Sequence, residues 1–178
     1  MAGKQIIYWD SSAFLALIKG EESHGTGELP ALKNQANEFD NGIILLATST
    51  VAILEVLSAE LDETQRNAFE GMIDRSNFVL VEASESIMRL AAEIRRYYYG
   101  KILDGNGKKL IVTSPDAIHI ASAVAIEAES LITFDSHNKP SKREAGMIQI
   151  GQLGPILGKH VLSIHRPAFG LTGDIFRG

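Results

Sequence analysis

The sequence contains no cysteine among its 178 residues. This absence excludes disulfide scaffolds, thiol nucleophiles, thiolate-bound zinc and iron–sulfur clusters, and it fits a reducing compartment. The chain also lacks any apolar run near the roughly 20 residues that a membrane-spanning helix needs. Because no basic stretch followed by a long apolar one opens the chain, we expect no signal peptide and a cytoplasmic protein without membrane attachment.

Positive charge is in short supply, because 17 Lys and Arg face 22 Asp and Glu and the net charge is −5. This balance excludes a basic coat protein that binds nucleic acid non-specifically over its whole surface. The basic residues are concentrated, however, between Arg89 and Lys109 and after Lys139. A local binding site for RNA is therefore compatible with the composition.

Short apolar runs alternate with helical patterns along most of the chain. Strands are expected at 5–9, 43–47, 78–81 and 131–134, with a possible fifth at 147–150. Helices are expected at 13–19, 32–39, 51–61, 64–75, 84–99 and 114–128. Continuous apolar runs are typical of strands buried on both faces, and the alternation predicts an α/β fold with a mainly parallel sheet.

The character of the sequence changes at Gly151. Glycine and proline then recur at short intervals and predict no regular element, at Gly154, Pro155, Gly158, Pro167, Gly170 and Gly173. The turn-rich stretch 20–30 is a loop by the same criterion. We therefore expect one domain over residues 1–150 and a C-terminal extension over 151–178 that covers the domain or meets a partner.

Helix starts are marked by hydroxyl residues. Ser11 or Ser12 is expected to cap the first helix, and Ser114 precedes Pro115 at the start of another. Serine is a favoured N-cap, and proline is favoured in the first turn. These caps place the acidic residues discussed next at or near helix N-termini.

Four carboxylates occupy positions that packing alone would not select. Asp10 and Asp135 each follow an apolar run directly, at the carboxyl end of an expected strand, where parallel sheets form their sites. Glu55 interrupts an apolar helix, and Asp116 lies in the first turn of its helix. Taken singly, each has a structural alternative: a turn or capping Asp, an exposed helix stripe for Glu55, or a partner of the helix dipole for Asp116.

His119 lies one turn after Asp116 on the same helix face. It could line the crevice or serve as a hydrogen-bonded packing residue, and the sequence leaves both open. The acids are more informative as a set, because several carboxylates in one crevice cannot all stay ionised without a cation. Oxygen ligands without cysteine suit Mg²⁺ or Mn²⁺, and such an ion can activate water and neutralise a phosphodiester.

Four segments resemble the four motifs of PIN domains in order and spacing. They are Tyr8–Phe14, Ser49–Glu55, Pro115–Ala123 and Leu131–Asp135. The resemblance covers about residues 5–150. It implies a three-layer α/β/α sandwich around a mainly parallel sheet of about five strands.

The same resemblance implies a metal-dependent endoribonuclease, most often the toxin of a VapBC-type toxin–antitoxin pair. Its catalytic acids would be Asp10, Glu55, Asp116 and Asp135. Of these, Asp10, Asp116 and Asp135 would bind Mg²⁺ or Mn²⁺ and position the attacking water. The implied partners are RNA, a small antitoxin whose tail blocks the crevice, and a second copy of the chain in a homodimer.

Three residues are candidates for supporting roles. Ser12 and Thr133 match the small hydroxyl residues that often support a PIN site, and His119 is a further candidate. The chain departs from the family at Ser136-His137, where many members carry another acid and an aromatic. The segment after Gly151 also exceeds the usual length of a PIN toxin.

Two basic groups are candidates for RNA contacts. Lys139, Lys142 and Arg143 follow the fourth motif, and Arg95 and Arg96 adjoin Tyr97 to Tyr99. Basic side chains with aromatics can hold single-stranded RNA by phosphate contacts and stacking. The alternative is a solvated helix face with tyrosines packed on the core.

Competing functions are a non-catalytic PIN-like module that binds RNA or protein, and other phosphoryl-transfer α/β proteins. A haloacid dehalogenase-type phosphatase needs a second Asp two residues after the first, where this chain has Ser12. A response-regulator receiver needs an acidic pair at the end of the first strand, which is also missing. The Gly105–Lys109 loop lacks the P-loop pattern.

Overall fold

A five-stranded sheet forms the centre of the protein, in a computed structural model that describes residues 4–20 and 27–169. The strand order is β3-β2-β1-β4-β5, and every pairing is parallel. The strands are β1 (Ile6–Trp9), β2 (Leu45–Ser49), β3 (Phe78–Val81), β4 (Ser130–Ile132) and β5 (Ser163–His165). The predicted parallel sheet is confirmed.

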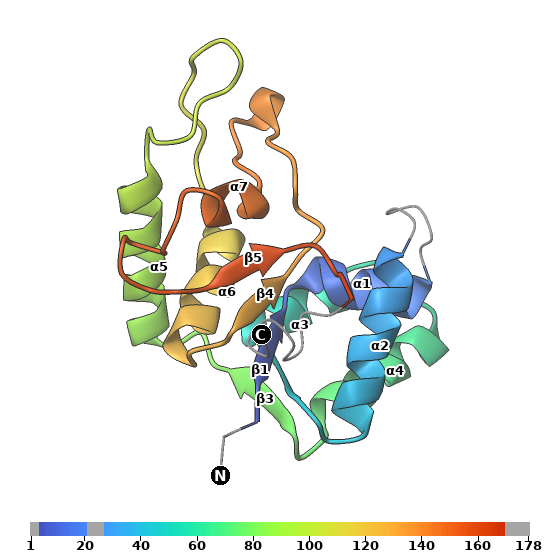
Figure 1. The fold of residues 1–178 in the computed structure, drawn as a ribbon. Coiled ribbons are helices and arrows are strands. Elements are labelled where there is room, and N and C mark those ends of the chain that lie inside the picture. Colours follow the sequence, from blue (N-terminus) through green and yellow to red (C-terminus); the bar gives the residue numbers. More distant parts are fainter. Residues whose placement is uncertain (1–3, 21–26, 170–178) are drawn as a thin grey trace.

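Helices cover both faces of the sheet (Figure 1). One layer contains α1 (Ser11–Lys19), α2 (Glu28–Asp40), α3 (Thr50–Leu57) and α4 (Glu63–Ile73). The other contains α5 (Glu85–Tyr98), α6 (Ser114–Ala125) and α7 (Met147–Gly151). The result is the predicted three-layer α/β/α sandwich.

The central strand β1 shows why its sequence is apolar throughout. Ile7 and Trp9 face the core under α1–α4, whereas Tyr8 faces the core under α5–α7, and all three side chains are fully buried. Successive side chains of a strand point to opposite faces, so a strand covered on both sides needs an unbroken apolar run. Phe14 of α1 packs edge-on against Trp9, with ring centroids 5.3 Å apart, and fixes the helix that follows Asp10.

The prediction of a fifth strand at 147–150 is wrong, because these residues form α7. The backbone N–H of Met147 donates to the Asp135 side chain at 3.0 Å, which satisfies one of the unpaired donors at the start of that helix. The fifth strand is β5, which pairs with β4 in the segment predicted to lack regular structure. Gly151 allows this packing, since a Cβ there would lie 2.9 Å from Ile164 of β5.

Several predicted helix ends are also corrected. Asp10, rather than Ser11 or Ser12, caps α1, and Thr113, rather than Ser114, caps α6. The helix predicted over 51–61 ends at Leu57, because Asp62 starts a separate capping box for α4. Helix α2 begins at Glu28, earlier than predicted, and most of the turn-rich stretch before it (21–26) lies outside the described residues.

No helix in residues 4–20 and 27–169 is both long and apolar enough to span a membrane.

Candidate active site

Asp10 and Asp135 lie where the strand order reverses. The chain passes from β1 to β2 on one side, whereas β4 and β5 add on the other side of β1. Asp10 follows the last residue of β1, and Asp135 lies three residues beyond the end of the neighbouring β4. Open parallel sheets form their sites outside the carboxyl ends of the strands at such a reversal, and both acids lie at that edge.

The Asp10 carboxylate is buried and held from three directions. Its Oδ1 accepts hydrogen bonds from Ser12 Oγ at 2.6 Å and from the Ala13 N–H at 3.0 Å. Its Oδ2 accepts from Thr133 Oγ1 at 2.6 Å. Burial raises the pKa of Asp10 above its ordinary value, although the charge of His119 and these three hydrogen bonds act to lower it.

Ser12 and Thr133 connect this carboxylate to the end of β4. The Phe134 N–H donates to Ser12 Oγ at 2.8 Å, and the Asp135 N–H donates to Thr133 Oγ1 at 2.9 Å. Each hydroxyl therefore donates to Asp10 and accepts from the segment that carries Asp135. This double link fixes the two acids relative to each other.

Asp116 lies in the first turn of α6 and interacts electrostatically with Asp10 and Asp135. Thr113 Oγ1 donates to Asp116 Oδ2 and accepts from the Asp116 N–H. The pKa of Asp116 is raised to about 6, chiefly by burial and to a lesser degree by the charges of Asp135 and Asp10, while the Thr113 hydrogen bond and the His119 charge oppose the shift. Three carboxylates thus share one region of negative potential.

The raised pKa of Asp116 predicts a specific pH dependence of stability. Its value of about 6 lies above the ordinary 3.8, so between these values the folded state binds the proton more tightly than the unfolded state. Protonated Asp116 favours the fold at low pH, and this advantage is lost as the pH rises toward 6. In EDTA, the unfolding free energy of Asp116→Asn minus that of the parent should increase from pH 4 to pH 6 and then level off. A difference that stays constant over this range would contradict the assignment.

Asp135 has a cationic partner within the site. Its Oδ1 pairs with Lys139 Nζ at 2.9 Å, and its Oδ2 accepts from the Met147 N–H. The hydrogen bond to Asp135 raises the pKa of Lys139, burial opposes the shift, and the charges of Asp135, Asp116 and Glu144 add to it. Lys139, predicted to contact RNA, therefore lies against the acidic set.

Glu55 joins the site through His119. His119 is buried in α6, and its Nε2 lies 2.9 Å from Glu55 Oε2. Its Nδ1 lies 2.8 Å from the hydroxyl of buried Tyr8. Burial tends to raise the pKa of Glu55, but hydrogen bonds from His119 and Ser11 and the His119 charge outweigh it, so the pKa is lowered.

The other predicted basic residues lie on two neighbouring segments. Lys142 and Arg143 are exposed and lie on the segment that follows the fourth motif. This segment is hydrogen-bonded to the one before α6, because the Ile111 N–H donates to the Arg143 carbonyl at 2.8 Å. This loop and the one over 101–109 project side by side in Figure 1. Exposed Arg95 and Arg96 lie in the last turn of α5.

Carboxylates that could bind a metal ion are present, but their side chains are not gathered closely enough to form a complete coordination shell. Within residues 4–20 and 27–169, no three Asp, Glu or His side chains lie close enough together to hold an ion. Acceptor capacity remains, because Asp10 Oδ2 has one protein donor and Asp116 Oδ1 receives none from the described residues. Oxygen donors of this kind, on carboxylates whose charges act on one another, fit a hard divalent cation.

Two contributors to the site were not predicted. Thr113 anchors the Asp116 carboxylate, and the spacing Thr113-x-x-Asp116 is the capping-box pattern that could have revealed it. Tyr8 supports His119 across 111 residues of sequence. No local pattern signals that contact, because it depends on which face of β1 lies under α6.

Comparison with known proteins identifies a sequence family and structures of similar fold. The sequence model of the PIN domain matches residues 7–139. A crystal structure of VapBC2 from Rickettsia felis, bound to a DNA fragment from their promoter, is similar with a TM-score of 0.55 and 16% identity, over 90% of this chain and 98% of that one. A toxin–antitoxin complex from Klebsiella pneumoniae aligns with a TM-score of 0.49 and 20% identity, over 71% of this chain and 84% of that one.

A search of curated proteins found no significant match. The family match is nevertheless extensive, since it runs from the middle of β1 to Lys139 and includes every predicted acid. The α/β fold with its parallel five-stranded sheet accords with it. The chain belongs to the PIN domain family.

Proposed function

We propose that this protein is a metal-dependent endoribonuclease, the toxin of a VapBC-type toxin–antitoxin pair. It would hydrolyse RNA phosphodiester bonds with water activated at the acidic site. The observation that carries the proposal is the grouping of Asp10, Asp116 and Asp135 at the carboxyl edge of the sheet, where burial, together with the charges of Asp135 and Asp10, raises the pKa of Asp116 to about 6.

Asp10, Asp116 and Asp135 would hold the ion, Mg²⁺ or Mn²⁺. When bound, such an ion lowers the pKa of a coordinated water and offsets charge on a phosphodiester. The chain's own residues position the acids: Ser12 and Thr133 fix Asp10. Glu55, with its lowered pKa, is ionised at neutral pH and would accept a proton or orient the water.

RNA is the proposed substrate, and the basic loops supply the contacts. Lys139, Lys142 and Arg143 follow the acidic site on one segment, and Arg95 and Arg96 end a neighbouring helix. A small antitoxin is proposed as a partner, on the likeness in fold to the VapBC2 structure. A second copy of the chain is proposed from the resemblance of the four motifs to PIN domains. The proposed location is the cytoplasm. Because β5 belongs to the central sheet, the domain continues at least to His165, and any separate C-terminal extension would begin beyond it.

Metal removal tests the activity. The purified chain, incubated with single-stranded RNA and Mn²⁺ or Mg²⁺, should release shorter fragments, and excess EDTA should abolish cleavage. Restoring Mn²⁺ after EDTA should return it, which separates metal dependence from damage to the protein. Cleavage that continues undiminished in EDTA would reject the metal-dependent mechanism.

One observation favours the alternative of a non-catalytic PIN-like binding module. Lys139 Nζ pairs with Asp135 at 2.9 Å, so a cation already neutralises one of the acids. In that case RNA would bind without being cut, with or without divalent ions. The same assay separates the two functions, because bound but intact RNA in saturating Mn²⁺ would identify the module.

A further inference from the structure

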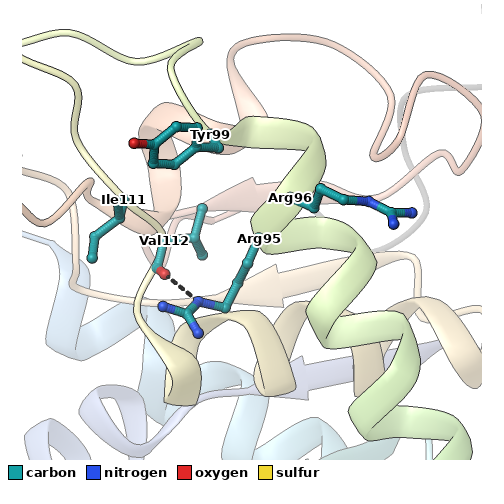
Figure 2. Close-up of a pocket in the computed structure, with 5 residues that line it drawn as sticks. All are labelled: Arg95, Arg96, Tyr99, Ile111 and Val112. Atoms are coloured by element: carbon teal, nitrogen blue, oxygen red, sulfur yellow. Dashed lines mark hydrogen bonds between the residues drawn. The ribbon is translucent and has the colours of Figure 1, made fainter.

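A pocket of about 460 Å³ lies between the last turn of α5 and the segment that precedes α6. Its lining consists of Arg95, Arg96, Tyr99, Ile111 and Val112. In Figure 2, Arg95 reaches across to the Val112 carbonyl, and Tyr99 stands at the other end of the pocket. The pocket therefore combines a cation, an aromatic ring and an apolar wall, and it contains no carboxylate.

Arg95 offers hydrogen-bond donors that the described protein does not use. Its Nε donates to the Val112 carbonyl at 2.9 Å, and this contact fixes the guanidinium plane. No described carboxylate pairs with its terminal nitrogens, whereas Arg75, Arg89 and Arg166 each pair with an acid. A fixed guanidinium with outward donors is suited to a phosphate oxygen.

Tyr99 offers a ring face to a flat ligand. Its side chain is 58% exposed, although most large apolar side chains of this layer are buried in the core. Lys109 Nζ lies over the ring, 5.3 Å from its centroid, and adds positive charge beside the aromatic surface. An exposed aromatic beside cations is the arrangement that stacks a base while the cations hold the adjoining phosphates.

The pocket adjoins the acidic site through the backbone. Val112 is followed by Thr113, the residue that caps α6 and contacts the Asp116 side chain. A smaller pocket of about 130 Å³ shares Arg95 and includes Ser114, next to the same cap. The two pockets therefore connect the basic end of α5 to the segment that holds Asp116.

We propose that this pocket is a nucleotide subsite for single-stranded RNA, with one base stacked on Tyr99 and its phosphate bound by Arg95. The proposal rests on the proposed function, because it assumes RNA as the ligand. The proposal assigns the phosphate contact to Arg95 and not to Arg96, because Figure 2 shows the Arg96 side chain extending away from Tyr99 and Val112. It also assigns Tyr99, rather than Tyr97, as the stacking residue.

The test measures binding of a fluorescent single-stranded RNA of mixed sequence to the full chain in EDTA, in the Asp116→Asn background. Tyr99→Ala should weaken binding about 10-fold or more, whereas Tyr99→Phe should stay within about twofold. Tyr97→Ala is the matched control, because Tyr97 lies two residues before Tyr99, is partly exposed, packs against Tyr98 and does not line the pocket.

A second pair of variants tests the phosphate contact. Arg95→Gln should weaken binding and reduce the slope of log affinity against log salt by about 0.7, the value for one phosphate of a single strand. Arg89→Gln removes the same charge from the same helix but from an arginine paired with Glu85, and it should leave the slope unchanged.

The outcomes distinguish the subsite from the function. If the parent cleaves RNA but Tyr99→Ala and Arg95→Gln bind it as tightly as their controls, the subsite is rejected and the nuclease stands. Equal losses in Tyr99→Phe and Tyr99→Ala would also reject stacking. If the parent neither binds nor cleaves RNA, the proposed function and the subsite are both rejected.

Discussion

Asp116→Asn is expected to lower the rate of RNA cleavage at least about 100-fold, because it removes a charge that the site must present to a cation or a developing charge. The fold should be preserved or stabilised. At neutral pH the parent holds an ionised carboxylate whose pKa is raised to about 6, and the neutral amide relieves that cost. The measurement is the cleavage rate in saturating Mn²⁺ together with urea unfolding at the same pH.

Asp74→Asn provides the control for this prediction. Asp74 is an exposed residue at the C-terminal end of α4, far along the chain from every predicted acid, and its replacement should change neither quantity. Cleavage by Asp116→Asn at the parent's rate would exclude Asp116 from the chemistry. A large loss of stability would show instead that the residue is structural.

His119→Ala is expected to reduce the unfolding free energy by about 2–4 kcal/mol. The imidazole is buried and contacts the Tyr8 hydroxyl on one side and Glu55 on the other. Its removal takes one hydrogen-bond partner from each and leaves a cavity beneath α6. RNA cleavage should fall as well, since Glu55 loses the contact that positions it. Urea unfolding and the cleavage rate measure the two effects.

Glu55→Gln separates these two effects. The amide oxygen can still accept from His119 Nε2, so the unfolding free energy should change by less than about 1 kcal/mol. Cleavage should nevertheless decrease, because the amide cannot accept a proton from water. A His119→Ala variant as stable as the parent would mean that the buried contact contributes little.

Two of the candidate acids could be predicted from the sequence, because each stands at a boundary with a clear pattern. Asp10 ends an apolar strand, and Asp116 begins a helix marked by Pro115. The sheet was predictable for the same reason, since unbroken apolar runs such as Ile6–Trp9 identify strands buried on both faces.

The parts that could not be predicted depend on contacts distant in sequence. The segment 147–150 is short and mostly apolar, and nothing local reveals that its first N–H is bound by the Asp135 side chain at the start of a helix. Nor does the local sequence show that β5 forms the edge of the sheet. Ser163–His165 is too short and too polar to signal a strand; its pairing with β4 provides the structure. Likewise, the pairing of Lys139 with Asp135, and of His119 with Glu55, follows from the packing of the whole chain.

The position of a bound ion tests the central claim most directly. Crystals of the full chain soaked in Mn²⁺ should show an anomalous difference peak in contact with Asp10, Asp116 and Asp135, and the peak should be lost in Asp116→Asn. A map with no peak at these three carboxylates in saturating Mn²⁺, or with an ion bound only elsewhere, would contradict the account.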